Sequence, residues 1–208
     1  MSVSEEHAVQ PSATTVILQP PADPAPLGLA GFATTTFLLS AANAGWMGKA
    51  SGAAFLGYAF AYGGLCQLLA GMWEFRNRNV FGAAAFSTYG GFWIGLGLWV
   101  LLVAPKDTAA QAGYDKAWIV LAFAIVNTYL LILSTQINMA VFMVFLTLEV
   151  TELLLFIGGF ASSSGLVKAG GYIGVLTAIV AWYTSAAFIS RGMAGGKLVF
   201  PVGKALIS

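Results

Sequence analysis

Residues 23–32 read Asp-Pro-Ala-Pro-Leu-Gly-Leu-Ala-Gly-Phe and join a polar tail to the first long apolar run of the chain. The two prolines fix φ near about −65° and remove two backbone donors, so a helix can begin only around the second proline. Asp23 places a carboxylate near the positive end of that helix. Gly28 and Gly31 leave a patch without side chains, where another helix or a small solute can approach the backbone.

The composition indicates an integral membrane protein. Of 208 residues, 59% are hydrophobic and only 8% are charged, against about 25% in ordinary soluble domains. A helix needs about 20 apolar residues to cross a bilayer, so six spans use nearly the whole length. The formal net charge of +1 provides no basic surface for a nucleic acid. With Cys66 as the single cysteine, no disulfide can form within the chain.

We predict an all-α integral membrane protein built as a tightly packed, glycine-rich bundle of six transmembrane helices. Residues 1–22 are expected to form a disordered tail, residues 23–192 the bundle, and residues 193–208 a C-terminal tail against the cytoplasmic face. Loops are expected at 105–115 and 158–171. The six apolar runs lie at 26–43, 52–73, 84–104, 116–135, 139–158 and 170–190.

Glycine spacing indicates where these helices pack closely. One face of the second span carries glycines seven residues apart, and two later spans carry pairs four residues apart. We expect these positions to contact other helices, either within the chain or between subunits. The glycines are Gly57, Gly64 and Gly71, then Gly91 with Gly95, and Gly170 with Gly174.

An even number of spans places both termini on one side of the membrane. Five basic residues lie on that side and four on the other, which favours cytoplasmic termini in a cell membrane. The first group is Arg76, Arg78, Arg191, Lys197 and Lys204, and the second is Lys49, Lys106, Lys116 and Lys168.

Three further motifs follow in the second and third spans. Residues 63–74 read Gly-Gly-Leu-Cys-Gln-Leu-Leu-Ala-Gly-Met-Trp-Glu, residues 79–82 read Asn-Val-Phe-Gly, and residues 86–93 read Phe-Ser-Thr-Tyr-Gly-Gly-Phe-Trp. Together with residues 23–32, these motifs resemble the signatures of the acetate uptake transporters, also called succinate–acetate permeases. The chain departs from that pattern at Asp23, where the family has Asn, at Arg78, where it has Gly, and at Thr88, where it has Ser.

The resemblance implies an apolar constriction formed by Phe32, Tyr89 and Leu148. It also implies that Ala181 is associated with substrate size. It further implies a homo-hexamer with a pathway in each protomer. We expect no cofactor.

Several polar groups are candidates to receive a carboxyl group. Hydroxyls near the constriction could accept it on either side, and the amino-terminal NH groups of the first helix could hold the anion. The candidates are Asp23, Pro24, Leu27, Gly28, Thr34, Thr35, Gln67, Ser87 and Thr88, with Ala181 from the resemblance. Gln67 could equally join two helices, and Glu74 is expected to form a local charge pair with Arg76 or Arg78.

Glu149 and Glu152 stand in the middle of the fifth apolar run, where the resemblance implies uncharged residues. An acid at this depth costs a few kcal/mol unless it finds protons, water or a partner. Glu152 follows Leu148 by one turn, so the two share a helix face. We consider two roles for these acids, proton coupling during passage and solvation in a hydrated gap between subunits.

These observations predict a membrane transporter for acetate and similar small monocarboxylates, with succinate as a further candidate, coupled to protons. A passive channel for small neutral solutes or undissociated acids is the alternative. A membrane sensor or scaffold is disfavoured because the motifs lie inside the spans. The chain shows no basis for catalysis, since it has no cysteine pair, metal-ligand spacing or histidine within a span.

Overall fold

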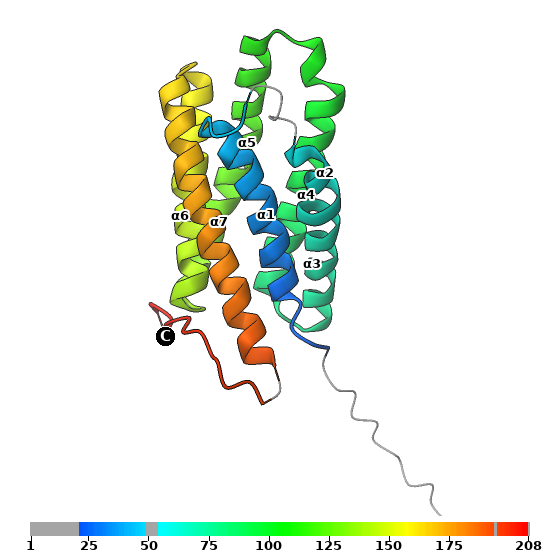
Figure 1. The fold of residues 1–208 in the computed structure, drawn as a ribbon, viewed down its shortest axis with the longest axis vertical. Coiled ribbons are helices and arrows are strands. Elements are labelled where there is room, and N and C mark those ends of the chain that lie inside the picture. The colour runs from blue at the N-terminus through cyan, green and yellow to red at the C-terminus, as the bar shows by residue number, and fades with distance from the viewer. Residues whose placement is uncertain (1–20, 49–53, 194, 208) are drawn as a thin grey trace, which may run out of the picture.

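The computed structural model describes residues 21–48, 54–193 and 195–207, and in these ranges the chain is helical without strands (Figure 1). Six helices are long and apolar enough to cross a membrane, which confirms the predicted class of a multi-pass membrane protein. The predicted tail at 1–22 lies outside the described residues except for its last two. The elements are α1 (Ala25–Asn43), α2 (Phe55–Phe60), the π-helical η2 (Ala61–Cys66), α3 (Gln67–Arg76), α4 (Val80–Leu102), the 3-10 turn η3 (Ala104–Lys106), α5 (Ala109–Ser134), α6 (Met139–Phe160) and α7 (Ser164–Gly192).

The proline-containing stretch starts α1 as the sequence predicts. The carbonyl of Pro24 accepts hydrogen bonds from the backbone NH groups of Leu27 and Gly28 at 3.1 and 3.2 Å. A carboxylate oxygen of Asp23 accepts one from the NH group of Ala25 at 2.9 Å. Asp23 therefore satisfies one of the donors that every helix leaves free at its amino-terminal end.

Two predicted loops are largely helical, so those predictions were wrong. Thr108 accepts a hydrogen bond from the NH group of Gln111 and starts α5 seven residues before the predicted span. Ser163 accepts one from the NH group of Leu166 and starts α7 six residues early. Capping by a hydroxyl side chain extends both helices past the apolar runs from which the spans were predicted.

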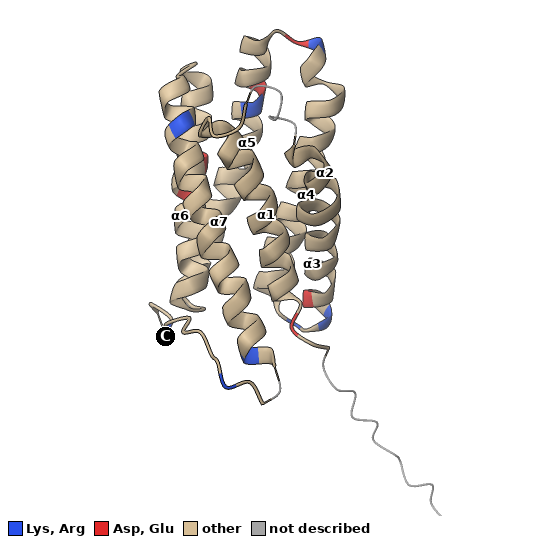
Figure 2. Cartoon of the chain, in the orientation of Figure 1, with Lys and Arg blue, Asp and Glu red and all other residues tan. Residues whose placement is uncertain are grey.

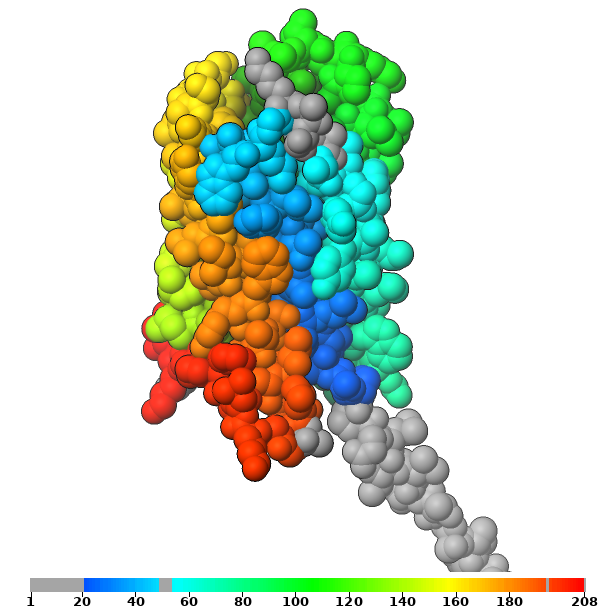
Figure 3. Space-filling view, viewed as in Figure 1, coloured from blue at the N-terminus to red at the C-terminus, as the bar shows by residue number. Residues whose placement is uncertain are grey.

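Helix α1 is the centre of the bundle. It packs against α7 on one side and against η2 and α3 on the other, while α6 lies between α7 and α5 (Figures 1 and 3). Glycines make these approaches possible. A Cβ atom at Gly63 would collide with the side chain of Thr35, and one at Gly174 would collide with that of Ser40. The tight, glycine-dependent packing expected from the sequence is present around α1.

Three of the seven predicted glycine contacts do not form among the described residues. A Cβ at Gly57, Gly91 or Gly95 would meet no atom within 4 Å among the described residues, and all three are exposed. Gly57 loses its alignment with the later glycines because η2 is π-helical, which changes the phase of the span. A contact of these glycines with a second subunit stays a prediction.

The turn between α3 and α4 contains Arg78 at φ 61°, a left-handed conformation that glycine adopts without strain. This is the position at which the resemblance expects glycine. Asn79 follows and starts α4 by accepting a hydrogen bond from the NH group of Gly82 at 3.1 Å. The turn therefore keeps a glycine-like backbone with an arginine side chain.

Charge is distributed along the bundle as in a membrane protein. Figure 2 shows Lys and Arg residues gathered toward the two ends, whereas acidic residues also occur within the length of α6. The start of α1 and residues 195–207 lie at the same end (Figure 1). The C-terminal segment packs there, since Val202 is buried and its carbonyl accepts a hydrogen bond from the NH group of Ala140 at 2.9 Å.

Candidate functional site

Two cavities lie inside the bundle, and three residues line both of them. The first has a volume of about 280 Å³ and the second about 50 Å³. Phe32, Tyr89 and Leu148 belong to the walls of both cavities and are each at least 94% buried. The rings of Phe32 and Tyr89 meet edge to face with centroids 5.6 Å apart. The three side chains predicted to form a constriction are thus brought together between two cavities.

Three helices line the two cavities with helical periodicity. On each of α1, α4 and α6, a stripe of residues on one helix face begins in the first cavity, includes one of the three shared residues and continues into the second cavity. The α1 stripe is Ala25, Leu29, Phe32, Thr36, Leu39, Ser40 and Asn43. Because this stripe runs from one end of α1 to the other, the cavities lie on opposite sides of the constriction.

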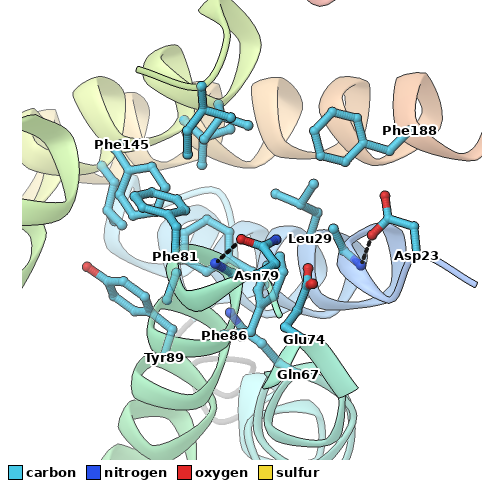
Figure 4. Close-up of a pocket in the computed structure, with 18 residues that line it drawn as sticks. Asp23, Leu29, Gln67, Glu74, Asn79, Phe81, Phe86, Tyr89, Phe145 and Phe188 are labelled. Atoms are coloured by element: carbon cyan, nitrogen blue, oxygen red, sulfur yellow. Dashed lines mark hydrogen bonds between the residues drawn. The ribbon is translucent and has the colours of Figure 1, made fainter. Parts of the chain in front are cut away.

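Polar side chains from separate elements meet in the first cavity. Asp23, Gln67, Glu74 and Asn79 line it, and Figure 4 shows Glu74 and Asn79 close together across from Leu29. Gln67 is 2% exposed and Glu74 is 1% exposed. Over the described residues, neither Gln67 Oε1 nor Glu74 Oε1 finds a hydrogen-bond partner. Buried polar atoms of this kind require water or a ligand, so this cavity is suited to a polar occupant.

The position of Glu74 differs from the prediction. Arg76 and Arg78 are exposed, whereas Glu74 is buried and lines the cavity. Its Oε1 atom lacks a partner in the part of the chain that the structure describes, so the predicted charge pair was wrong. Successive residues of an α-helix are rotated by about 100° around its axis, so Glu74 points inward while its neighbours in sequence point outward. Gly82 makes room for it, because a Cβ there would lie 2.6 Å from Glu74 Oε1.

The second cavity contains the buried acid of α6 and a lysine of α5. Glu152 is 5% exposed, and its Oε2 atom has no partner among the described residues. Since Glu152 is buried within one chain, the alternative in which both acids face a gap between subunits is wrong for this residue. Lys116 lines the same cavity, together with Thr36 and Asn43. A carboxyl group, an ammonium group and an amide therefore face one small space.

A hydrogen-bonded chain leads from the constriction to α5 and α6. The hydroxyl of Tyr89 lies 3.1 Å from Asn127 Oδ1 and 3.4 Å from Glu152 Oε1. The amide of Asn127 donates to the carbonyl of Phe145 at 3.0 Å and to Glu149 Oε2 at 2.7 Å. Asn127 is completely buried and Glu149 is half-buried. The constriction is thereby connected to both acids of α6.

The other predicted carboxyl-binding residues do not line either cavity. Thr35 is buried and donates to the carbonyls of Gly31 and Tyr58. Thr34 accepts a hydrogen bond from Trp182, and Ser87 packs against Gly71. The remaining predicted residues outside both cavity walls are Pro24, Leu27, Gly28, Thr88 and Ala181. Their roles in binding stay predictions.

Three residues of the site were missed from the sequence. Thr36 follows Phe32 by one turn, so its spacing from the constriction residue was a usable signal. Asn127 is an amide in the middle of an apolar run, a position that requires a partner in a membrane. Lys116 was assigned to the end of a span, but α5 begins at Ala109 and carries it inside the helix.

The fold and the cavities define a six-span membrane protein in which three buried, mostly apolar side chains lie between two cavities. A family model matches residues 6–195, and the chain belongs to the GPR1/FUN34/yaaH family.

Named relatives cover most of the chain. It is 39% identical over 185 residues to ammonia transport outward protein 2 of Saccharomyces cerevisiae, covering 86% of this chain but only 66% of the yeast protein. It is 32% identical to the succinate-acetate/proton symporter SatP of Escherichia coli K12, covering 88% of this chain and 96% of that protein. The solved structure of a bacterial acetate channel SatP is similar with a TM-score of 0.81 and 30% identity, over 88% of this chain and 99% of that one.

Proposed function

We propose that the chain transports acetate and similar small monocarboxylates, with succinate as a further substrate, through a path inside each protomer. One observation carries this proposal, namely that Phe32, Tyr89 and Leu148 line two cavities on opposite sides of a shared constriction. Relatives named for acetate include SatP of Escherichia coli, matched over 96% of its length, and acetate permease A of Emericella nidulans, matched over 62%. The match over nearly the whole length of SatP makes acetate the substrate to test first.

The constriction supplies selectivity by size and polarity. Its three side chains are apolar apart from one hydroxyl, so an ion would have to lose its water there without replacement. A solute with two carbons and one carboxyl group needs few contacts and little width. Polar side chains line the cavities on both sides of the constriction. Gln67 and Glu74 line the first cavity, and Lys116 and Glu152 line the second.

We infer further that Glu152 takes part in proton coupling. Its carboxyl group is buried, reaches the Tyr89 hydroxyl and keeps one oxygen without a partner in the described structure. A proton on Glu152 avoids a bare charge in this environment. A passive channel for undissociated acid is the second candidate, because apolar constriction walls admit a neutral molecule more easily than an anion.

The protein is proposed to work as a homo-hexamer in a cell membrane with cytoplasmic termini. The exposed glycines Gly57, Gly91 and Gly95 support assembly, because they offer smooth helix surfaces that nothing in the described chain covers. The basic residues near the termini support the orientation.

Acetate uptake by purified protein in liposomes tests this function. Uptake is followed with and without an inward-acid pH gradient, while a trapped dye reports the internal pH. Protein-free liposomes correct for the leak of acetic acid through lipid. Accumulation above equilibrium with protein-dependent proton entry supports coupled transport. Equilibration without accumulation supports the channel, and the absence of any protein-dependent acetate flux contradicts the function.

A further inference from the structure

Tyr89 has one hydroxyl proton but two acceptors within reach. Asn127 Oδ1 lies at 3.1 Å and Glu152 Oε1 at 3.4 Å. A phenol can donate only one strong hydrogen bond at a time, while its oxygen can also accept one. All three groups are at least 95% buried, so water cannot easily replace a lost partner.

The protonation state of Glu152 determines whether the Tyr89 hydroxyl donates its hydrogen bond to Asn127 or to Glu152. When Glu152 carries a proton, its own OH group can donate to the oxygen of Tyr89, and Tyr89 donates to Asn127. When Glu152 is a carboxylate, it is the stronger acceptor and takes the hydroxyl proton of Tyr89 for itself. Asn127 Oδ1 then loses its donor.

We propose that Asn127 is a positioning residue of the constriction that competes with Glu152 for the hydroxyl proton of Tyr89. The backbone carbonyl of Phe145 and the carboxylate of Glu149 hold the Asn127 amide in place, at 3.0 and 2.7 Å. Its Oδ1 atom is therefore fixed toward Tyr89. Loss of the proton from Glu152 turns the Tyr89 hydroxyl away from Asn127 of α5 and toward Glu152 of α6. The direction of the only hydroxyl group in the constriction therefore changes.

Few charged residues lie close enough to Glu152 to affect its titration in the described structure. Glu152 faces Tyr89 from α4 and Glu149 on its own helix, and Lys116 of α5 lines the same cavity. Helix α1 contributes the uncharged polar residues Thr36, Ser40 and Asn43 to this cavity, and α7 carries its charges, Lys168 and Arg191, in exposed positions.

Infrared spectroscopy of the purified protein tests the competition directly. The C=O band of a protonated carboxyl group is followed against pH and assigned to Glu152 by its loss in Glu152→Gln. Asn127→Leu removes the competing acceptor, so the carboxylate gains the tyrosine proton and titrates about 0.5 to 1 pH unit lower. Tyr89→Phe removes the donor and shifts the titration to higher pH. Asn127→Leu added to Tyr89→Phe then produces no further shift.

Thr128→Val is the matched control. Thr128 donates to the other oxygen of Glu149 at 2.9 Å and shares no hydrogen bond with Tyr89 in the described structure, so this variant should titrate as the parent does. An unchanged titration in folded Asn127→Leu, or no Glu152 band that titrates, would overturn the proposal. If Asn127→Leu does not fold, an unshifted Tyr89→Phe has the same effect. This measurement records no flux, so a negative result would contradict the competition for the Tyr89 proton without contradicting the proposed transport function. Only the effect of the competition on substrate passage rests on that proposed function.

Discussion

At the scale of single residues, the chemistry of the site depends on a few polar groups placed by helix phase. Phe32, Tyr89 and Leu148 come together although they are distant in sequence, and the resemblance of the motifs predicted this trio. The buried partners of the trio could not be predicted in the same way. The pairing of Tyr89 with Asn127 requires the relative rotation of α4 and α5, which no spacing within either helix determines.

Lys116 offers a prediction at this scale. It lines the second cavity, and an ammonium group there attracts a carboxylate by about 1 kcal/mol even with strong solvent screening. Lys116→Gln should therefore raise the KM for acetate about fivefold in liposome uptake. Lys168→Gln is the control, since this lysine is exposed on α7. An equal KM in both variants would remove Lys116 from the substrate path.

At the scale of helices, the apolar runs predict the number and order of the spans but not their phase or their ends. Thr108 and Ser163 extend two helices by capping, a local effect that a window of hydrophobicity does not register. The π-helical η2 shifts the face on which Gly57 lies. As a result, the glycines of α7 contact other helices within the chain, whereas the predicted contact of Gly57 in α2 is left to a second subunit.

Neighbouring glycines of α4 provide a test of this packing. A Cβ at Gly90 would lie 2.7 Å from the backbone nitrogen of Leu68, whereas Gly91 faces open space in the described structure. Backbone cannot move aside easily, so Gly90→Ala should destabilise the protomer by about 1–3 kcal/mol. Gly91→Ala should change stability little. Thermal unfolding in detergent compares the two, and equal melting temperatures would contradict the packing of α3 against α4.

At the scale of the whole molecule, the bundle contains two cavities and leaves smooth glycine surfaces on its outside. If the protein assembles as proposed, Gly95→Trp should break the contact between subunits without unfolding the protomer, because a Cβ at Gly95 meets nothing within the described chain. Mass determination of the detergent complex should show six subunits in the parent and fewer in the variant. A parent that is monomeric, or a variant that remains hexameric, would place the interface elsewhere.

The central claim is that Phe32, Tyr89 and Leu148 form the barrier that small monocarboxylates pass. The most direct test compares acetate and butyrate flux into liposomes for the parent protein and for Leu148→Ala. Removing this side chain from the wall shared by both cavities widens the barrier. We predict that the parent passes acetate much faster than butyrate and that the variant raises butyrate flux at least about tenfold, since about 1.4 kcal/mol of barrier corresponds to a factor of ten. An unchanged ratio of the two fluxes in the folded variant would contradict the account.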